Sequence, residues 1–474
     1  MTTRRDVVKG LAASAILAPA VLAGPRARAA LPALPDLPES EALLLRPQDA
    51  HFADFQPAFN ARVMVTPELR ALCKTAHAVA VVLDWCRSNN LGFALRSGGH
   101  CYEGLSESAS VVIDTRMINQ IGVDKAGKTV TAGAGATLGA IYKQTGALDF
   151  AIPAGSCPTV GVSGHVLGGG YGFLGRPLGL ACDSLQAVSL IDPHGQVLEA
   201  NAQQHPDLFW VCRGGGGGSF GVATSFRFQM HAVPQVATFG ISWLLPPARA
   251  ARIFKTWQAW APQAPSPINA LFRFSRHATG NLDLRCFGQS TGSVSQLKRE
   301  LKVLSSKPEI KSMSFLASVN HFAGPDGWTF QSVSMKGKSD YVMTPLGDDG
   351  ILALMEGVAA RSGITVICDP YGGAISTTAP DATAFAHRAG TLYCMQYAST
   401  WSGGSDARHL ADMASLYAAM RPFMSGAAYV NYCDVDLADW PNAYWGSNLA
   451  RLKQIKAAFD PDNVFRHALS IPVA

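Results

Sequence analysis

The sequence predicts an α+β protein with two lobes, on the basis of its length, its composition and the placement of its glycines. The 474 residues exceed a single domain of about 100 to 200 residues. Hydrophobic residues make up 48% and charged residues 15%, which provides a large buried core and excludes intrinsic disorder. Short β-type runs with glycine-rich turns fill residues 46–233, whereas residues 234–425 lose the glycine clusters after proline-rich stretches. Sequential strands with long glycine loops favour an α+β fold over a regular βαβ series.

The first 29 residues have the order of an export signal. Arg4 and Arg5 precede an apolar run over residues 10–23, and Ala27-Arg28-Ala29 follows as a small-x-small cleavage site. The apolar run is shorter than the stretch of about 20 residues that a membrane span needs. The adjacent arginines resemble a twin-arginine signal, which exports folded proteins; an ordinary secretory signal with a chance arginine pair is the alternative. We therefore expect a periplasmic or secreted protein that can acquire a cofactor before it is exported.

The net charge argues against a nucleic-acid partner. The formal charge is +5, and +4 of it lies in residues 1–29, so that the rest of the chain has no broad basic field. The ten cysteines form no CxxC pair and no His/Cys spacing typical of zinc, so no metal site is predicted. Most cysteines are expected to be small buried apolar groups.

Residues 30–45 are rich in proline and leucine and form a lead-in to the first lobe. A helix is expected at residues 67–89. Strands are expected at residues 92–96, 110–114, 129–132, 187–192 and 223–230.

The second lobe interleaves strands with helices. Its strands are expected at residues 271–276, 282–288, 363–368 and 391–397, and its helices at residues 293–305 and 406–420. In the tail, a helix over residues 448–459 is stopped by Asp460-Pro461.

Three short motif matches are rejected because their context is wrong. Residues 122–129 fit GxxxxGK[ST], but a strand-type run follows where a phosphate loop opens a helix, so they read as a hairpin tip. Residues 170–175 and 216–221 fit GxGxxG without an acidic residue about 20 positions on in a βαβ unit. Residues 217–221 fit the nucleophile elbow, yet a strand-type run follows here too. A P-loop, a Rossmann fold and a serine hydrolase are all disfavoured.

Three glycine clusters, at residues 96–100, 153–172 and 213–221, stand at strand ends. Glycine permits positive φ and lets backbone amides approach an anion, but it costs conformational entropy on folding. His100 lies in the first cluster and Cys157 in the second. We therefore expect chain that lies tightly against a flat or charged ligand; three flexible loops are the alternative.

These clusters, in their order and spacing, resemble the berberine-bridge-enzyme-like FAD-linked oxidases, which have the vanillyl-alcohol-oxidase/p-cresol-methylhydroxylase fold. The resemblance covers essentially the whole mature chain and rests on RSGGH (96–100), VVIDTRMIN (111–119), CPTVGVSGHVLGGGYG (157–172), FWVCRGGGGGSFG (209–221), YVNYCD (429–434) and AYWGSNLARLKQIKAAFDPDNVF (443–465). It implies an FAD-binding domain at residues 46–233 and a substrate-binding domain at 234–425, with an antiparallel sheet covered by helices. It also implies a C-terminal segment, 426–474, that returns to the FAD domain.

The resemblance implies FAD attached through two covalent bonds, one from His100 to the 8α-methyl group and one from Cys157 to C6 of the isoalloxazine. Amides of residues 97–99 would meet the pyrophosphate, and residues 161–172 would wall the ring system. The residues expected to contact FAD are Arg96, Ser97, Gly98, Gly99, His100, Cys157, Val160, Gly161, Ser163, Gly164, His165, Gly168, Gly169, Gly170, Gly221 and Val222.

The implied reaction moves hydride from a carbinol carbon to flavin N5 while a base takes the hydroxyl proton. The motif position makes Tyr432 the expected base, although a phenol with a pKa of about 10 needs a stabilising neighbour. Tyr102, Gln396, Asp369 and Tyr429 are expected to line the site.

The resemblance also bears on the electron acceptor and the substrate. Val160, three residues after Cys157, occupies a position that the family associates with oxidases, so we expect O2 as acceptor and hydrogen peroxide as product. A dehydrogenase with another acceptor and a catalytically silent flavin-binding module are the alternatives. A carbohydrate, another polyol or a secondary-metabolite alcohol is the expected substrate. Aromatic residues of the second lobe could stack on sugar rings or fill the core; they are Trp243, Trp257, Trp260, Trp328, Tyr371, Tyr393 and Trp401.

Overall fold

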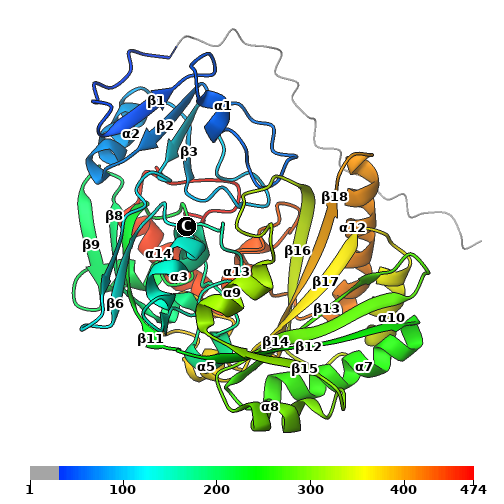
Figure 1. Ribbon diagram of the computed structural model, residues 1–474. Helices are drawn as coiled ribbons and strands as arrows, with labels where there is room; N and C mark the ends of the chain where they lie inside the picture. Colours follow the sequence, from blue (N-terminus) through cyan, green and yellow to red (C-terminus); the bar gives the residue numbers. More distant parts are fainter. Residues whose placement is uncertain (1–30, 474) are drawn as a thin grey trace, which may run out of the picture. The chain divides into compact units, whose positions relative to one another are not determined.

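The computed structural model describes residues 31–473, and the strands in this part of the chain form four β-sheets (Figure 1). The expected signal peptide, residues 1–29, lies outside the described residues. Residues from Pro35 onward form one unit, to which the following description refers. The predicted two-lobe α+β fold is confirmed, with a four-stranded and a five-stranded sheet in the first lobe and a seven-stranded antiparallel sheet in the second.

The four-stranded sheet carries the first glycine cluster at the end of one strand. Its order is β1 (Ala42–Leu45), β2 (Leu69–Cys73), β4 (Val111–Asp114) and β3 (Phe93–Arg96). The β2–β4 and β3–β4 pairs are parallel, and β1 pairs antiparallel with β2. Because β3 ends at Arg96, the chain leaves the sheet directly into residues 97–100.

The predicted helix at residues 67–89 is wrong in its first third. Residues Leu69–Cys73 form β2, all five of them buried, and only Ala76–Ser88 form a helix, α2. Pairing with strands on both sides overrides the local preference. The helix begins where the Thr75 hydroxyl accepts a hydrogen bond from the backbone N–H of Ala78 at 3.1 Å, which is an N-cap.

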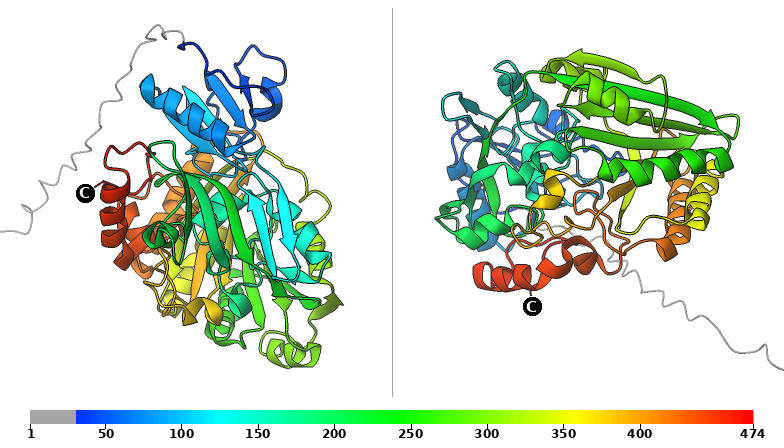
Figure 2. Two further views of the ribbon diagram at one scale, coloured as in Figure 1. Left: turned by 90° about the vertical axis from the view of Figure 1, so that its left-hand side faces the viewer. Right: turned by 90° about the horizontal axis from the view of Figure 1, so that it is seen from below.

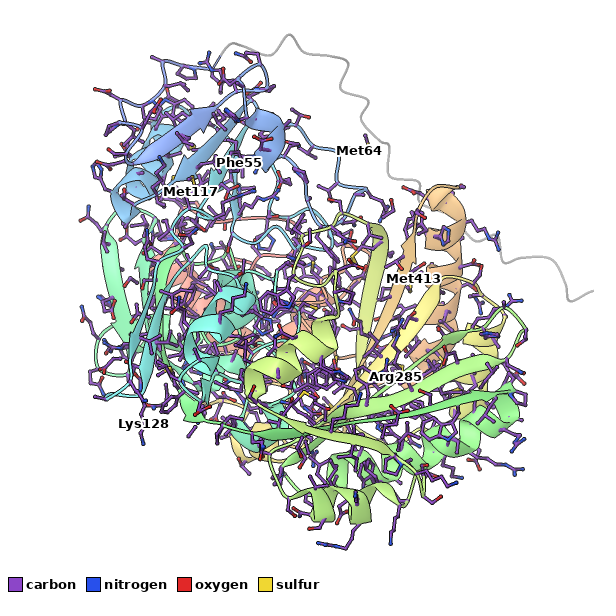
Figure 3. All side chains as sticks on the ribbon, viewed as in Figure 1. Phe55, Met64, Met117, Lys128, Arg285 and Met413 are labelled. Atoms are coloured by element: carbon purple, nitrogen blue, oxygen red, sulfur yellow. The ribbon has the colours of Figure 1, made fainter. Side chains whose placement is uncertain are left out.

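The five-stranded sheet has the order β5 (Ile121–Asp124), β6 (Thr129–Gly133), β10 (Val222–Gln229), β8 (Leu185–Ile191) and β9 (Val197–Asn201). Residues 122–129 turn between β5 and β6 as an antiparallel hairpin, with Lys128 projecting at the rim of the lobe (Figure 3). The rejection of a phosphate loop is therefore confirmed. Strand β10 directly follows residues 217–221, which confirms that they do not open the helix of a nucleophile elbow.

The second lobe is built on one antiparallel sheet. Its order is β15 (Glu309–Met313), β12 (Val236–Leu245), β14 (Leu282–Ser290), β13 (Ile268–Arg276), β17 (Ile364–Pro370), β18 (Tyr393–Trp401) and β16 (Ser334–Val342). Helices α7 (Pro247–Trp260), α10 (Asp348–Ala359) and α12 (Asp406–Met420) cover one face, as Figure 1 shows, and share a hydrophobic core with it. The strands and helices expected here are all present, with bounds shifted by a few residues.

Short helices and turns complete the described chain. They are α1 (Phe52–Phe55), α3 (Leu138–Gly146), α4 (Val162–Leu167), α5 (Gly175–Leu178), α6 (Pro206–Val211), α8 (Val294–Leu301), α9 (Phe315–Ala323), α11 (Ala374–Thr377), α13 (Trp440–Trp445), α14 (Leu449–Phe459) and the 3-10 turns η1 (Ala181–Asp183), η2 (Ala261–Gln263), η3 (Arg421–Phe423) and η4 (Gly446–Asn448). Two short strands, β7 (Phe150–Ala151) and β11 (His231–Ala232), pair with each other. Among the described residues, we find no helix with the length and apolar character needed to cross a membrane.

The C-terminal segment packs against the first lobe. Helix α14, drawn in red, lies beside the first-lobe elements in both views of Figure 2 and contacts α6. The buried ammonium of Lys456 donates hydrogen bonds to the carbonyl of Ser219 at 2.8 Å and to Asp460 Oδ2 at 2.6 Å. One buried cation therefore joins the tail to the third glycine cluster.

Candidate active site

A cavity of about 800 Å³ lies between the lobes and receives residues from both of them and from the C-terminal segment. Its lining includes parts of all three glycine clusters. Of the residues expected to contact a cofactor, the lining contains Arg96, Ser97, Gly98, Gly99, His100, Cys157, Val160, Gly161, Ser163, Gly164, His165, Gly221 and Val222. The three clusters, far apart in the sequence, therefore converge on one space.

The first two clusters touch each other backbone to backbone. A Cβ atom added to Gly98 would lie 2.6 Å from the Cα of Gly161, and one added to Gly161 would lie 2.7 Å from Ser97 Oγ. The Ser97 hydroxyl in turn donates a hydrogen bond to the carbonyl of Ala134 at 2.7 Å. Neither Gly98 nor Gly161 has room for a Cβ atom, so only glycine fits at these two positions, which we call the cradle.

Three of the expected contact residues stand apart from the cavity. Within the described chain, Gly168, Gly169 and Gly170 are absent from its lining. A Cβ added to Gly168 would meet the side-chain amide of Asn431, and the N–H of Gly170 donates to the hydroxyl of Tyr429 at 3.0 Å. These glycines allow close packing behind the wall, which sequence motifs do not distinguish from ligand contact.

Two expected contact residues have side chains that are already engaged. The guanidinium of Arg96 is buried against Glu107 and the carbonyl of Pro57. His165 Nε2 accepts a hydrogen bond from the N–H of Gly155 at 2.9 Å, and burial lowers the pKa of His165 to about 4, so the ring is neutral. Both residues shape the wall.

His100 presents a neutral ring at the cavity. The ring stacks on Phe59 with centroids 4.6 Å apart and meets the edge of Phe330 at 5.2 Å. The Thr159 hydroxyl lies 3.1 Å from His100 Nε2. Burial lowers the pKa of His100 to about 4, so at neutral pH a ring nitrogen keeps its lone pair.

Cys157 stands at the same wall, two residues before Thr159. All ten cysteines lie within the described residues, and Cys157 is the one with an exposed side chain; it lines the cavity, and desolvation there raises the pKa of its thiol. The cavity lining therefore contains both an uncharged imidazole and an exposed thiol, which belong to the two residues that the resemblance implies as points of attachment.

Four polar residues expected to be catalytic form a connected group. The rings of Tyr102 and Tyr432 stack with centroids 5.9 Å apart and planes 2° from parallel. The side-chain amide of Gln396 donates to the Tyr102 hydroxyl at 2.8 Å, and the Tyr432 hydroxyl donates to Asp369 Oδ2 at 3.3 Å. Tyr429 lies at the back of this group, with its ring 4.9 Å from that of Tyr432.

Burial sets the protonation states of this group. It raises the pKa of Tyr432 far above 10, and the nearby Asp369 carboxylate raises it further. Burial also raises the pKa of Asp369 to about 7, although the hydrogen bond from Tyr432 opposes the shift. At neutral pH the phenol is therefore protonated, and Asp369 is the member that changes charge.

The sheet of the second lobe closes the cavity with a mostly apolar face. Leu271 pairs in register with Phe287, and Ile367 pairs with Gln396 and lies two residues before Asp369 on the same face. All five residues line the cavity. Apolar side chains thus surround the polar group on this wall.

Two further aromatic residues extend the apolar wall. The rings of Phe173 and Phe322 stack at 4.1 Å, and Phe173 meets Phe287 edge-on at 6.1 Å. These two side chains were not predicted from the sequence, because Phe173 lies in a turn and Phe322 in helix α9, and neither position belongs to one of the quoted motifs. The aromatic residues of the second lobe that could have stacked on sugar rings or filled the core are all absent from the lining within the described chain; they are Trp243, Trp257, Trp260, Trp328, Tyr371, Tyr393 and Trp401.

Comparisons with known proteins agree with this geometry. A family model described as "FAD binding domain" matches residues 67–201, and one described as "Berberine and berberine like" matches residues 428–472. An uncharacterized FAD-linked oxidoreductase of Bacillus subtilis, YgaK, is 31% identical over 90% of this chain and 95% of its own length. A protein of Arabidopsis thaliana named monolignol oxidoreductase AtBBE-like 13 is 33% identical over 84% of this chain and 82% of its own length.

Solved structures give the same result. BBE-like 1 of Physcomitrella patens superposes with a TM-score of 0.84 at 30% identity, covering 91% of this chain and 97% of that one. The berberine bridge enzyme of Eschscholzia californica superposes with a TM-score of 0.84 at 27% identity, with coverages of 91% and 97%. A variant of Phl p 4 described as a glucose dehydrogenase has a TM-score of 0.84 at 29% identity, again covering 91% and 97%.

Proposed function

This chain belongs to the berberine-bridge-enzyme-like family of FAD-linked oxidoreductases, and we propose that it oxidises an alcohol carbon with FAD held by covalent bonds to both His100 and Cys157. The convergence of these two side chains and the polar group of Tyr432 on one cavity carries the proposal. When bound, FAD supplies the hydride acceptor. The residues present fit this cofactor, because the cradle where Gly98 meets Gly161 has no room for a Cβ and the exposed thiol faces the cavity.

Different parts of the chain would bind different parts of FAD. Backbone amides of the first glycine cluster suit the pyrophosphate, because glycine lets N–H groups approach an anion without steric hindrance. The neutral imidazole of His100, held between Phe59 and Phe330, is oriented before any bond forms. Residues 215–218 of the third glycine cluster line the cavity, as do residues of the C-terminal segment.

The polar group can take the hydroxyl proton of the substrate. In the proposed step the hydroxyl proton passes to the Tyr432 oxygen while the phenol proton passes to Asp369 Oδ2, 3.3 Å away. Asp369 thus serves as the final acceptor, with a pKa near 7 that matches this task. Gln396 holds the Tyr102 hydroxyl, and the Tyr102 ring fixes Tyr432 by stacking.

The apolar sheet face favours a primary alcohol carried on a flat, apolar body over a free sugar. The side chains of Leu271, Phe287 and Ile367 offer no hydrogen bonds to a polyol, and the aromatic residues that could have stacked on sugar rings lie outside the cavity lining. The name of the relative AtBBE-like 13, a monolignol oxidoreductase, is consistent with an aromatic alcohol. The sequence led us to expect a carbohydrate, another polyol or a secondary-metabolite alcohol; we now propose an allylic or benzylic alcohol, with carbohydrates as the competing class.

The proposal includes O2 as the electron acceptor and export from the cytoplasm. Val160, the position expected to favour oxidases, lines the cavity. Export rests on the sequence of residues 1–29 alone; a fusion of these residues to a reporter that is active only outside the cytoplasm tests it, and a strain lacking the twin-arginine translocase tests the route.

Two measurements test the function. First, the full protein is denatured in acid; yellow colour is expected to stay with the polypeptide, to persist in H100A and C157A singly, and to separate in the double variant. Loss of colour from the wild-type protein would contradict covalent attachment.

Second, peroxide release is measured with cinnamyl alcohol, benzyl alcohol, glucose and cellobiose.

A matched pair of measurements tests the substrate class. The aryl alcohols are expected to give the higher kcat/KM, and F287Q is expected to lower that value by about 10- to 200-fold, because it removes apolar contact from the pocket. The same variant is expected to leave any residual activity with glucose within about threefold. A sugar that outperforms both aryl alcohols contradicts the proposed substrate class and leaves the oxidation itself in place.

A further inference from the structure

Two cysteines outside the proposed chemistry meet at the cavity wall. Cys101 Sγ and Cys433 Sγ lie 3.7 Å apart although the two residues are 332 positions apart in the sequence. Cys101 directly follows His100, and Cys433 directly follows Tyr432. Both cysteines line the cavity, so a small molecule that enters it can reach them.

A buried ionic bridge holds the two cysteine segments side by side. The ammonium of Lys336 donates to Glu103, two residues after Cys101, and to Asp434 Oδ1 at 2.8 Å, one residue after Cys433. The side chain of Lys336 is 4% exposed. The approach of the two sulfurs is therefore fixed by interactions other than their own.

The contact between the two sulfurs is one in which either thiol can be the hydrogen-bond donor. The N–H of Leu105 donates to Cys101 Sγ at 3.3 Å. The hydrogen bonds that Cys101 Sγ receives lower the pKa of Cys101, and the pKa of Cys433 is raised. These contacts favour the thiolate at Cys101, which is the reactive form of a cysteine.

We propose that Cys101 and Cys433 are an oxidisable pair that forms a disulfide bond when hydrogen peroxide enters the cavity. A disulfide needs an S–S distance of about 2.05 Å, so the sulfurs must approach by about 1.7 Å. The Cys101 thiolate attacks one peroxide oxygen, which gives a sulfenic acid and hydroxide. The Cys433 sulfur then attacks the sulfenic sulfur, the S–S bond forms, and water leaves with the Cys433 proton. In total, two thiols and one peroxide give one disulfide and two waters.

The disulfide would join the two segments on which the proposed site depends. It would connect the residue after His100 to the residue after Tyr432, beside the stacked rings of Tyr102 and Tyr432. A covalent bond across 332 positions restricts the unfolded chain strongly, so the oxidised protein should also resist thermal unfolding.

Differential labelling of the full protein tests the pair. The protein is reduced, freed of reductant and exposed to graded hydrogen peroxide. It is then denatured in the presence of N-ethylmaleimide, which blocks the free thiols. The disulfides are reduced afterwards, and the released thiols are labelled with iodoacetamide. Trypsin releases residues 409–451, in which Cys433 is the single cysteine, and residues 97–116, in which Cys101 is the single cysteine. Because residues 409–451 hold neither His100 nor Cys157, the labelling of Cys433 reports on the pair whether or not flavin is attached.

The expected result is that Cys433 takes the iodoacetamide label at peroxide concentrations at least tenfold lower than the buried cysteines require. C101S is expected to abolish this early labelling of Cys433, whereas the matched control C86S, at a buried cysteine of α2, leaves it unchanged. A thermal shift with peroxide is expected in wild type and C86S and absent in C101S. Retention of N-ethylmaleimide on Cys433 at all peroxide concentrations, or early labelling that survives in C101S, overturns the proposal.

Discussion

Replacement of Asp369 by asparagine tests whether the site needs a proton acceptor at this position, because the substitution changes the shape of the site little. Asparagine keeps the size of the side chain and retains an oxygen that accepts the hydrogen bond from Tyr432. It removes the group that changes charge near pH 7. A positioned general base contributes about 10²- to 10⁴-fold to rate, so we expect D369N to lower kcat/KM by at least about 10²-fold.

The pH profile identifies the cause of this loss. In the wild-type protein kcat/KM is expected to rise with pH and to level off above about pH 7, as Asp369 becomes ionised. In D369N this limb is expected to disappear. D326N is the matched control, because Asp326 is an exposed carboxylate that lines the same cavity. If D369N keeps the limb near pH 7, or more than half of the wild-type kcat/KM, the assignment of Asp369 is refuted.

D369N is expected to lower kcat/KM but to raise the free energy of unfolding above neutral pH. The folded state raises the pKa of Asp369 from its ordinary 3.8 to about 7, so the folded protein binds the proton more tightly than the unfolded chain. Stability from this group is therefore present below about pH 4 and is lost as pH rises to about 7. A shift of about three pKa units corresponds to about 4 kcal/mol, so D369N should gain up to that amount at pH 8 and nothing at pH 3.5. Denaturant unfolding at the two pH values measures the difference.

Three further predictions concern the cradle, the tail and the acceptor. G98A places a Cβ 2.6 Å from the Cα of Gly161 and should lower the unfolding free energy by about 1–3 kcal/mol and reduce flavin content, measured by denaturation and absorbance. K456M leaves Asp460 buried without its cation and should cost about 3–5 kcal/mol, measured by urea unfolding; an unchanged midpoint would contradict the role of Lys456. V160L should lower the rate of reoxidation by O2 at least tenfold while a dye acceptor is reduced at the wild-type rate; equal loss with both acceptors would count against an oxygen path at Val160.

Much of the site could be predicted from local sequence patterns, because the backbone contacts of the cradle require glycine. Glycines that allow backbone contact, such as Gly98 and Gly161, appear in the sequence as clusters. The same clusters contain Gly168–Gly170, which serve packing, because a glycine marks a close approach without identifying the neighbour. Strand β2 was missed because the strands that pair with both of its edges, β1 and β4, lie elsewhere in the chain.

Other features of the site could not be predicted because they arise only from tertiary folding. The order of the strands places β13, which carries Leu271, between β14, which carries Phe287, and β17, which carries Ile367, and no periodicity in a single strand contains that order. The contact between Cys101 and Cys433 spans 332 positions and follows from the way in which the tail returns to the first lobe. Spacing within a motif predicts nothing about such a pair.

The return of the tail has a consequence for the timing of assembly. Residues between 429 and 469 form part of the cavity wall, and Lys456 fastens them to the third glycine cluster. A nascent chain on the ribosome lacks this wall until nearly all codons have been read, even when the sheets of both lobes have already formed. We therefore expect FAD to be loaded after translation, and a ribosome-stalled chain that ends before residue 429 should carry no stably bound flavin.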